Sequence, residues 1–254
     1  MKKLLESFVA AFSMYSRIPM PHILWSEDSM KYAMCFFPLV GAVIGALEYL
    51  WFMPYRYGHI GVILYAAVAV VIPVLISGGI HLDGFLDTAD ALSSWREKEE
   101  RLRILKDSHV GAYAVIWACV LFILAFGAAS EIRAENIMPL CLIFMLSRTF
   151  SAFAVVSGLF PKANPDGTLA AFSDNAAKKN VRIVCVIYLI VISLLLWFSG
   201  RLTGMAVLAA GMLAFLLYRH VSLKYFGGTT GDLAGFFVTY SELLMLAAGV
   251  LITL

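Results

Sequence analysis

Residues 59–94 read HIGVILYAAVAVVIPVLISGGIHLDGFLDTADALSS. The first part, residues 59–80, is an apolar run long enough to cross the hydrocarbon core of a bilayer, which is about 30 Å thick. The second part carries Asp83, Asp87 and Asp90, whose spacing places them on one face of a helix. An apolar segment followed at once by an acidic helix face predicts a polar site at a membrane surface.

The composition of the whole chain also indicates a membrane protein. Of its 254 residues, 61% are hydrophobic and 14% are charged, whereas a soluble domain carries about 25% charged residues. The net charge of +2 gives no reason to expect a nucleic-acid partner. The four cysteines lie inside apolar runs without CxxC spacing, so neither a disulfide framework nor a zinc site is predicted. We expect one integral-membrane domain over residues 1–254.

Seven apolar runs have the length of a transmembrane helix. They lie at about residues 32–53, 59–80, 110–129, 137–160, 181–199, 202–219 and 234–254. Residues 200–204 leave room for only a very short turn between the fifth and sixth runs. An amphipathic helix over residues 4–16 is expected to precede the first run, to lie at the membrane interface and to remain in the mature protein. The prediction is an all-α polytopic membrane protein with about seven transmembrane helices and an N-terminal amphipathic helix.

Basic residues alternate between the two sides of this predicted bundle. The segment before the first run holds Lys2, Lys3, Arg17 and Lys31, and the connections after the second, fourth and sixth runs are also basic. Each of the other connections holds a single basic residue. Because basic connections stay in the cytoplasm, we predict a multi-pass protein of the cytoplasmic membrane with its N-terminus inside and its C-terminus outside. The acidic helix face then lies on the cytoplasmic side.

The three aspartates predict a metal site. Like charges on one helix face repel unless a cation lies between them, and hard oxygen ligands suit Mg²⁺ or Mn²⁺ together with substrate phosphates. We therefore assign Asp83, Asp87 and Asp90 as metal ligands and catalytic residues. Gly78 and Gly79 are expected to break the preceding helix and let a phosphate approach the backbone, and His81 is a candidate to contact a phosphate or act as a base.

Charged residues elsewhere are further candidates. Lys106 and Asp107 lie where the third apolar run begins. The lysine suits a phosphate contact, and the aspartate suits a further metal ligand or, like Asp90 and His81, the catalytic base. Arg148 is an isolated charge within the fourth run, and intramembrane charges face the bundle interior and pair there. Glu48 and Glu242 are its possible partners, and the alternatives of a structural ion pair and an anion-binding site for Arg148 and Glu242 stay open.

Two loops complete the set of candidates. Residues 164–167 read Asn-Pro-Asp-Gly, a turn signal that places Asp166 in a possible substrate loop. Residues 226–232 form a glycine-rich segment before the last run, which includes Gly228 and Asp232. A glycine-rich loop that opens a helix offers backbone N–H groups to an anion. Both loops are predicted to bind substrate.

These motifs resemble the cobalamin synthase family, also called adenosylcobinamide-GDP ribazoletransferases. The central match is GGIHLDGFLDTADAL at residues 78–92, and others follow in the family order: SRIPMP at 16–21, FPLVG at 37–41, KDSHVGA at 106–112, LSR at 146–148 and GTTGD at 228–232. The resemblance covers nearly the whole chain. It departs at residues 162–166, where Lys-Ala-Asn-Pro precedes Asp166 in place of an arginine-containing sequence followed by glutamate.

The resemblance implies a Mg²⁺-dependent transferase in the nucleotide-loop assembly step of cobalamin biosynthesis. Adenosylcobinamide-GDP and α-ribazole, or its 5′-phosphate, would give adenosylcobalamin, or its 5′-phosphate, and GMP. Implied partners are these substrates and the bilayer. Other late corrinoid-pathway enzymes and further copies of this chain are also possible partners.

Two other readings use the same residues. A CDP-alcohol phosphotransferase that makes a phospholipid shares the logic of metal-binding aspartates and a displaced nucleotide. Its pattern, however, requires an Asp three residues before Asp83, and position 80 is Ile. An ion-coupled transporter would use Glu48, Arg148 and Glu242, whereas most of the unusual acids gather at one face of the predicted bundle.

Overall fold

The computed structural model describes residues 2–23, 25–107, 109–163 and 168–254. Within these ranges the chain is helical, with one isolated bridge between Lys162 and Thr229 and no strand. The elements are α1 (Lys2–Tyr15), α2 (Glu27–Met30), α3 (Ala33–Arg56), α4 (Val62–Ser77), α5 (Ile80–Ser93), α6 (Lys98–Ile104), α7 (Ala112–Ser130), α8 (Ile137–Cys141), α9 (Ile143–Ser157), α10 (Thr168–Asn175), α11 (Lys178–Ser199), α12 (Arg201–Val221), the π-helix η1 (Ser222–Phe226) and α13 (Gly231–Leu251).

Six helical stretches of the described chain are long and apolar enough to cross a membrane. They are α3, α7, α8 with α9, α11, α12 with η1, and α13. A seventh apolar segment is α4, which is followed by α5 at an angle of 98°. The predicted all-α polytopic membrane architecture is confirmed.

The run predicted at residues 59–80 is shorter as a helix than expected. Helix α4 ends at Ser77, and the chain turns at Gly78 and Gly79, which both adopt left-handed backbone conformations with φ of 66° and 81°. Glycine adopts this region without the steric cost that other residues carry. The expected break at the two glycines is confirmed. Because α5 runs at nearly a right angle to α4, it does not continue in the direction of α4, and it is not one of the six stretches that are long and apolar enough to cross a membrane by themselves.

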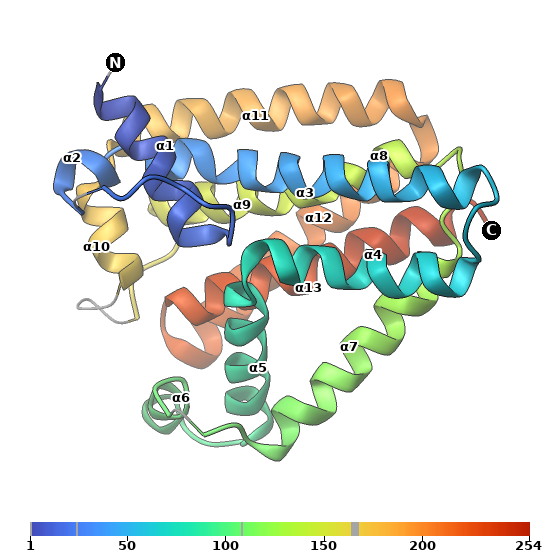
Figure 1. Cartoon of the computed structure of the whole chain (residues 1–254). Coiled ribbons are helices and arrows are strands. Elements are labelled where there is room, and N and C mark those ends of the chain that lie inside the picture. The colour runs from blue at the N-terminus through green and yellow to red at the C-terminus, as the bar shows by residue number, and fades with distance from the viewer. Residues whose placement is uncertain (1, 24, 108, 164–167) are drawn as a thin grey trace.

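The elements near the acidic helix gather toward one end of the bundle (Figure 1). Helices α1, α2, α10, α5 and α6 lie toward this end, whereas the C-terminus and the connection between α3 and α4 lie at the other.

The amphipathic helix expected over residues 4–16 is α1, which buries Val9, Ala10, Ala11 and Phe12 and leaves Leu4 and Leu5 exposed. A single residue, Gly200, joins α11 to α12, so the expected tight hairpin is confirmed.

The outer helices expose apolar surface. Helices α7 and α11 have high hydropathy and yet are mostly exposed along their length. Ile123 of α7 and Phe198 of α11 are 70% and 81% exposed. A soluble monomer rarely exposes contiguous apolar surface on this scale. These two helices therefore present a surface suited to lipid.

Glycines allow the inner helices to approach closely. A Cβ built on Gly41 of α3 would overlap the carbonyl of Phe144 in α9, and one on Gly45 would overlap the carbonyl of Cys141. Small residues are what let transmembrane helices pack backbone against backbone. The same device brings α5 to α13, where a Cβ on Gly84 would overlap the backbone of Asp232.

We predict that Gly41→Ala destabilises the protein by about 1–3 kcal/mol, because the added methyl group forces α3 away from α9. Thermal unfolding in detergent, followed by circular dichroism, measures the effect. Gly127→Ala is the matched control, since Gly127 is also helical but has open space around its Cα. The control should be neutral or slightly stabilising. Equal unfolding temperatures for the two variants would contradict the packing argument.

Candidate active site

Helix α5 carries the three aspartates on a fixed platform. Its N-cap is Gly79, and the Asp83 N–H donates to the Gly79 carbonyl at 2.8 Å. Arg17 lies against Gly78, and its backbone N–H donates to the Ile76 carbonyl at 2.7 Å. The two glycines therefore allow the turn between α4 and α5, and Gly78 leaves space for the Arg17 side chain. Whether they also admit a phosphate stays a prediction.

The acidic face of α5 meets a fourth carboxylate from α13. Asp83 is exposed, and Asp87 and Asp90 are half-buried. Asp232 enters the group because Gly84 and Gly235 let α5 and α13 touch at their backbones. The sequence places Asp232 in a phosphate-binding loop and gives no direct sign that it joins the other acids. The one available signal is the pair of glycines at the helix crossing.

The four carboxylates interact electrostatically. Burial raises the pKa of the Asp87 carboxyl to about 6. Negative charge on neighbouring acids acts in the same direction, first from Asp83, then from Asp232, and last from Asp90. Like charges that share a site disfavour full ionisation. The arrangement therefore favours a cation or a proton at this face.

Asp90 lies at the start of another helix. A Cβ on Gly111, the N-cap of α7, would overlap both carboxylate oxygens of Asp90. A carboxylate at a helix N-terminus is stabilised by the helix dipole and by the free N–H groups there. Asp90 therefore packs against the start of α7, a position that its spacing in the sequence does not reveal.

Lys106 and Asp107 lie in the exposed connection between α6 and α7. Asp107 accepts hydrogen bonds from the backbone N–H of His109 at 3.0 Å and from its ring Nδ1 at 2.7 Å. These bonds hold the pKa of Asp107 below its usual value. Asp107 is not among the charges that act on Asp87. Its predicted catalytic role and the phosphate contact of Lys106 stay predictions.

The two predicted substrate loops lie side by side. The Thr229 N–H donates to the Pro161 carbonyl at 2.8 Å, and the Ala163 N–H donates to the Thr229 carbonyl at 3.0 Å. Gly228 packs directly against residues 161–163, where a side chain would overlap the backbone. Asp166, in the predicted 164–167 turn, lies outside the described residues. The described part of this loop nevertheless reaches the glycine-rich segment.

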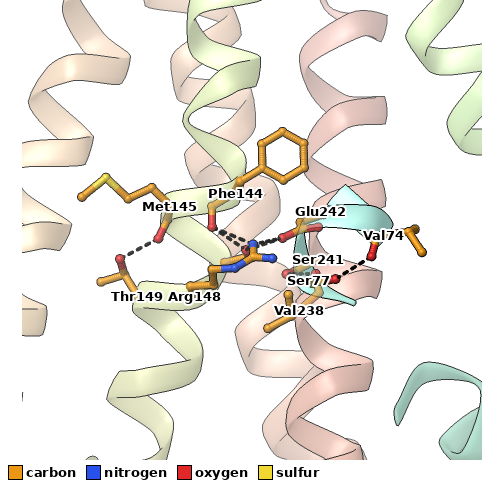
Figure 2. Close-up of polar contacts among 10 residues, drawn as sticks. Val74, Ser77, Phe144, Met145, Arg148, Thr149, Val238, Ser241 and Glu242 are labelled. Carbon is orange, nitrogen blue, oxygen red and sulfur yellow. Dashed lines mark hydrogen bonds and ion pairs between the residues drawn. The ribbon is translucent and has the colours of Figure 1, made fainter. Parts of the chain in front are cut away.

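Arg148 is paired inside the bundle (Figure 2). It is 1% exposed, and its Nη1 donates to the Glu242 Oε1 at 2.5 Å and to the Phe144 carbonyl at 3.0 Å. Ser147 also donates to Glu242, at 2.7 Å. Of the two possible partners, Glu242 is therefore the one used. Glu48 is also buried, and its Oε1 has no partner among the described residues.

Two cavities meet at His81. One, of about 120 Å³, lies in the bundle interior and is bordered by Glu48, Arg148 and Glu242. The other, of about 220 Å³, opens beside the acidic face and is bordered by Asp83 and Asp232. His81 is 7% exposed and lines both. The second cavity places space for a ligand next to two of the carboxylates.

The acids have the right chemistry for Mg²⁺. In the described ranges, no three His, Cys, Asp or Glu side chains already converge to hold a metal ion. Mg²⁺ needs fewer protein ligands, because it usually keeps several waters and binds one or two carboxylates together with substrate phosphates. Asp83, Asp87 and Asp232 supply mutually repelling oxygen donors of this kind. Two of these, Asp83 and Asp87, belong to the ligand set predicted from the sequence, whose third member is Asp90; metal binding stays a prediction.

The fold and this site define a polytopic helical membrane protein with a carboxylate cluster at one end of its bundle. A family model described as Cobalamin-5-phosphate synthase matches residues 7–250. The chain belongs to this family.

Similar proteins agree over nearly the full length. A protein of Lachnoclostridium phytofermentans named adenosylcobinamide-GDP ribazoletransferase is 45% identical over 98% of this chain and 97% of its own length. Proteins of the same name from Clostridium botulinum strain Alaska E43 and from Brevibacillus brevis are 33% and 30% identical. The alignment with the Clostridium protein spans 100% of both chains, and the alignment with the Brevibacillus protein spans 95% of this chain and 96% of that protein. No solved structure matches the chain.

The raised pKa of Asp87 predicts that the ionised carboxylate destabilises the folded state above the ordinary pKa of 3.8. Without added cation, stability should fall as pH rises from about 4 to about 7. Asp87→Asn should therefore stabilise the protein at pH 7.5 by about 1 kcal/mol, a figure reduced for solvent screening of a half-buried group. The gain should vanish near pH 4. Unfolding in EDTA at several pH values measures it.

Asp107→Asn is the control, because the pKa of Asp107 is shifted in the opposite direction from that of Asp87. Its pKa is lowered in the folded state, so its ionised form is favoured there, and the substitution should not stabilise the protein at pH 7.5. A stabilisation by Asp87→Asn that is equal at pH 4 and pH 7.5 would contradict the electrostatic account.

Proposed function

We propose that this chain is an adenosylcobinamide-GDP ribazoletransferase, the activity named for its relatives. It would join adenosylcobinamide-GDP to α-ribazole, or to α-ribazole 5′-phosphate, and release GMP. One structural observation supports this activity most: a cluster of four carboxylates beside a cavity at one end of the bundle. Membership of this family does not favour the alternative phospholipid synthase. It is the activity, rather than the family, that needs a direct test.

The reaction moves a phosphoryl group between two oxygens. A free ribose hydroxyl of the acceptor forms a bond to the phosphorus on the cobinamide side of the diphosphate; it is not the 5′ position, because that oxygen carries the phosphate when α-ribazole 5′-phosphate is the acceptor. The bond from this phosphorus to the bridging oxygen breaks, and GMP leaves with that oxygen. Such transfers depend on positioning and on stabilisation of charge more than on covalent participation by the protein.

The chain supplies the anionic framework for this chemistry. Asp83 and Asp87, with Asp90 and Asp232 beside them, would hold Mg²⁺, which would neutralise the diphosphate and the leaving GMP when bound. A carboxylate of the same face would accept the proton of the hydroxyl. The fixed turn at Gly78 and Gly79 and the α5–α13 crossing hold these acids in place before substrate arrives.

The active end is proposed to face the cytoplasm. The excess of basic residues in the segments at this end supports that orientation, with the N-terminus inside and the C-terminus outside. A corrinoid substrate could then dock at the membrane surface without crossing it. Association with other late corrinoid enzymes, or with further copies of the chain, would also take place on this side.

We predict that detergent-purified protein releases GMP from adenosylcobinamide-GDP and α-ribazole in Mg²⁺ but not in EDTA. Asp83→Asn should lower this rate at least ~100-fold, because a carboxylate proposed to hold the Mg²⁺ that stabilises the transition state is lost. Glu99→Gln, an exposed change on α6, should leave it unchanged. Folded protein that releases no GMP in either condition would rule out the proposed activity. GMP release unaffected by EDTA would rule out the metal.

We predict the topology from reporter fusions. Alkaline phosphatase fused after Leu254 should be active, because it folds only outside the cytoplasm, and a green fluorescent protein at the same point should be dark. The same reporters fused after Glu99, in the connection that follows α5, should give the reverse result. Matching signals at both points would contradict the proposed orientation.

A further inference from the structure

Three positively charged side chains gather where α6 meets η1. Helix α6 contacts both α5 and η1, and Figure 1 shows it below the first turns of α13. The guanidinium carbon of Arg101 lies 4.8 Å from the centroid of the Tyr225 ring, and the Lys224 ammonium lies 5.1 Å from the same centroid. Lys98 packs against Gly227, where a Cβ would overlap its ammonium group. We call Lys98, Arg101 and Lys224 the cation cluster.

The cation cluster has no carboxylate partner. Within the described ranges, no Asp or Glu lies within ion-pair distance of any of its three side chains. Glu100 of the same helix pairs with Arg103 instead, at 3.7 Å, and Glu97 and Glu99 are exposed. Charges of one sign that are held together without a counter-charge attract ions of the opposite sign. The cluster therefore suits an anion.

Arg101 keeps hydrogen-bond donors open to such an anion. Its side chain is half-buried, and its Nε is closed off without a partner, so this nitrogen can bind no ligand. Its two terminal nitrogens also have no hydrogen bond to a described residue, but neither of them is closed off in this way. Two terminal nitrogens of a guanidinium match a pair of phosphate oxygens. Arg101 is therefore the member of the cluster best suited to a phosphate.

The glycine-rich segment after η1 uses two of the backbone donors that its sequence offers to an anion. The Gly228 N–H donates to the Ser222 carbonyl at 3.0 Å, and the Thr229 N–H donates to the Pro161 carbonyl at 2.8 Å. These two groups are satisfied within the protein, so the neighbouring cations are the stronger candidates to bind an anion here. Lys224 lies on η1, and the π-helix is a rare geometry that is frequent at functional sites.

The cation cluster lies near the acidic face without neutralising it. Only a short loop separates Phe226, where η1 ends, from Asp232 in the first turn of α13. Among the described residues, the three cations are not among the charges that act on the carboxyls of Asp87 and Asp232. A ligand that contacts both groups needs metal-binding oxygens at one end and further negative charge at the other. A nucleoside diphosphate ester has this form.

We propose that Lys98, Arg101 and Lys224 bind the nucleotide side of the corrinoid donor, at the phosphate that leaves as GMP. The inference rests on the proposed function. The acidic face would hold the diphosphate through Mg²⁺, while the cation cluster would neutralise the phosphate that is joined to guanosine. The same cluster would bind free GMP and GDP, because both carry this phosphate.

The test removes single charges and measures nucleotide binding apart from turnover. Arg101→Gln and Lys224→Gln each remove one charge of the cluster, and Arg101→Lys keeps the charge. Arg103→Gln is the matched control, because it removes a charge from the same helix but from a side chain that pairs with Glu100. Binding of the fluorescent probe methylanthraniloyl-GDP, and its displacement by GMP, are measured in detergent with Mg²⁺. GMP release gives the KM of the corrinoid donor and that of α-ribazole.

Arg101→Gln should raise the Kd of the fluorescent GDP and the KM of the corrinoid donor by about 10-fold, the lower end of the range for a hydrogen bond to a charged group. Lys224→Gln should raise both by about 3-fold, because Lys224 is exposed. Arg101→Lys should recover part of the loss. All three variants should leave the KM of α-ribazole unchanged, and Arg103→Gln should leave every one of these values unchanged.

Unchanged binding of the fluorescent GDP in folded Arg101→Gln and Lys224→Gln would overturn the inference while leaving the proposed function intact. An equal loss in Arg103→Gln would indicate a general charge effect and also overturn it. Loss of co-purified phosphatidylglycerol from Arg101→Gln, with GDP binding unchanged, would assign the cluster to lipid headgroups instead. Absence of GMP release from wild type would count against the proposed function. The fluorescence measurement would then still decide whether the cluster binds the nucleotide.

Discussion

Mutual repulsion among four carboxylates is the constraint on which this structure depends. Asp83, Asp87 and Asp90 share one face of α5, and Asp232 is brought against them by α13. Such a group would push its helices apart if each were free to move. Gly84 and Gly235 oppose this by allowing backbone contact at the crossing. The resulting site attracts positive charge because its negative charge cannot disperse.

The remainder of the bundle holds this crossing in position. Asp90 reaches the start of α7 at Gly111, and Arg17 covers the turn that starts α5. On the other side, Thr230 caps α13 by accepting from the Leu233 N–H at 3.2 Å, just before Asp232. Contacts therefore hold both ends of α5 and the beginning of α13, and each contact lies within a few residues of one of the four aspartates. Rigid support of this kind is what a site needs to present charge to a substrate.

Much of the architecture could be predicted because it follows from local rules. Hydropathy and length located the apolar segments, and Gly78 and Gly79 marked the break before α5. Spacing alone placed Asp83, Asp87 and Asp90 on a common face. What could not be predicted depends on contacts between distant segments. Three features require knowing which helices cross and at which residue: the approach of Asp232, the choice of Glu242 over Glu48 as the partner of Arg148, and the two cavities that meet at His81.

The joint between α11 and α12 bears on how the chain enters the bilayer. A single glycine, Gly200, separates the two helices, and Gly204 packs against the Leu196 carbonyl on the opposite arm. Arg201 is the one charged residue at this tip, and its guanidinium lies over the Trp197 ring at 5.5 Å. A hairpin with so little polar chain at its turn is suited to insertion as a pre-paired unit. During biogenesis, the cost of moving its tip across the hydrocarbon would then fall mainly on that one arginine.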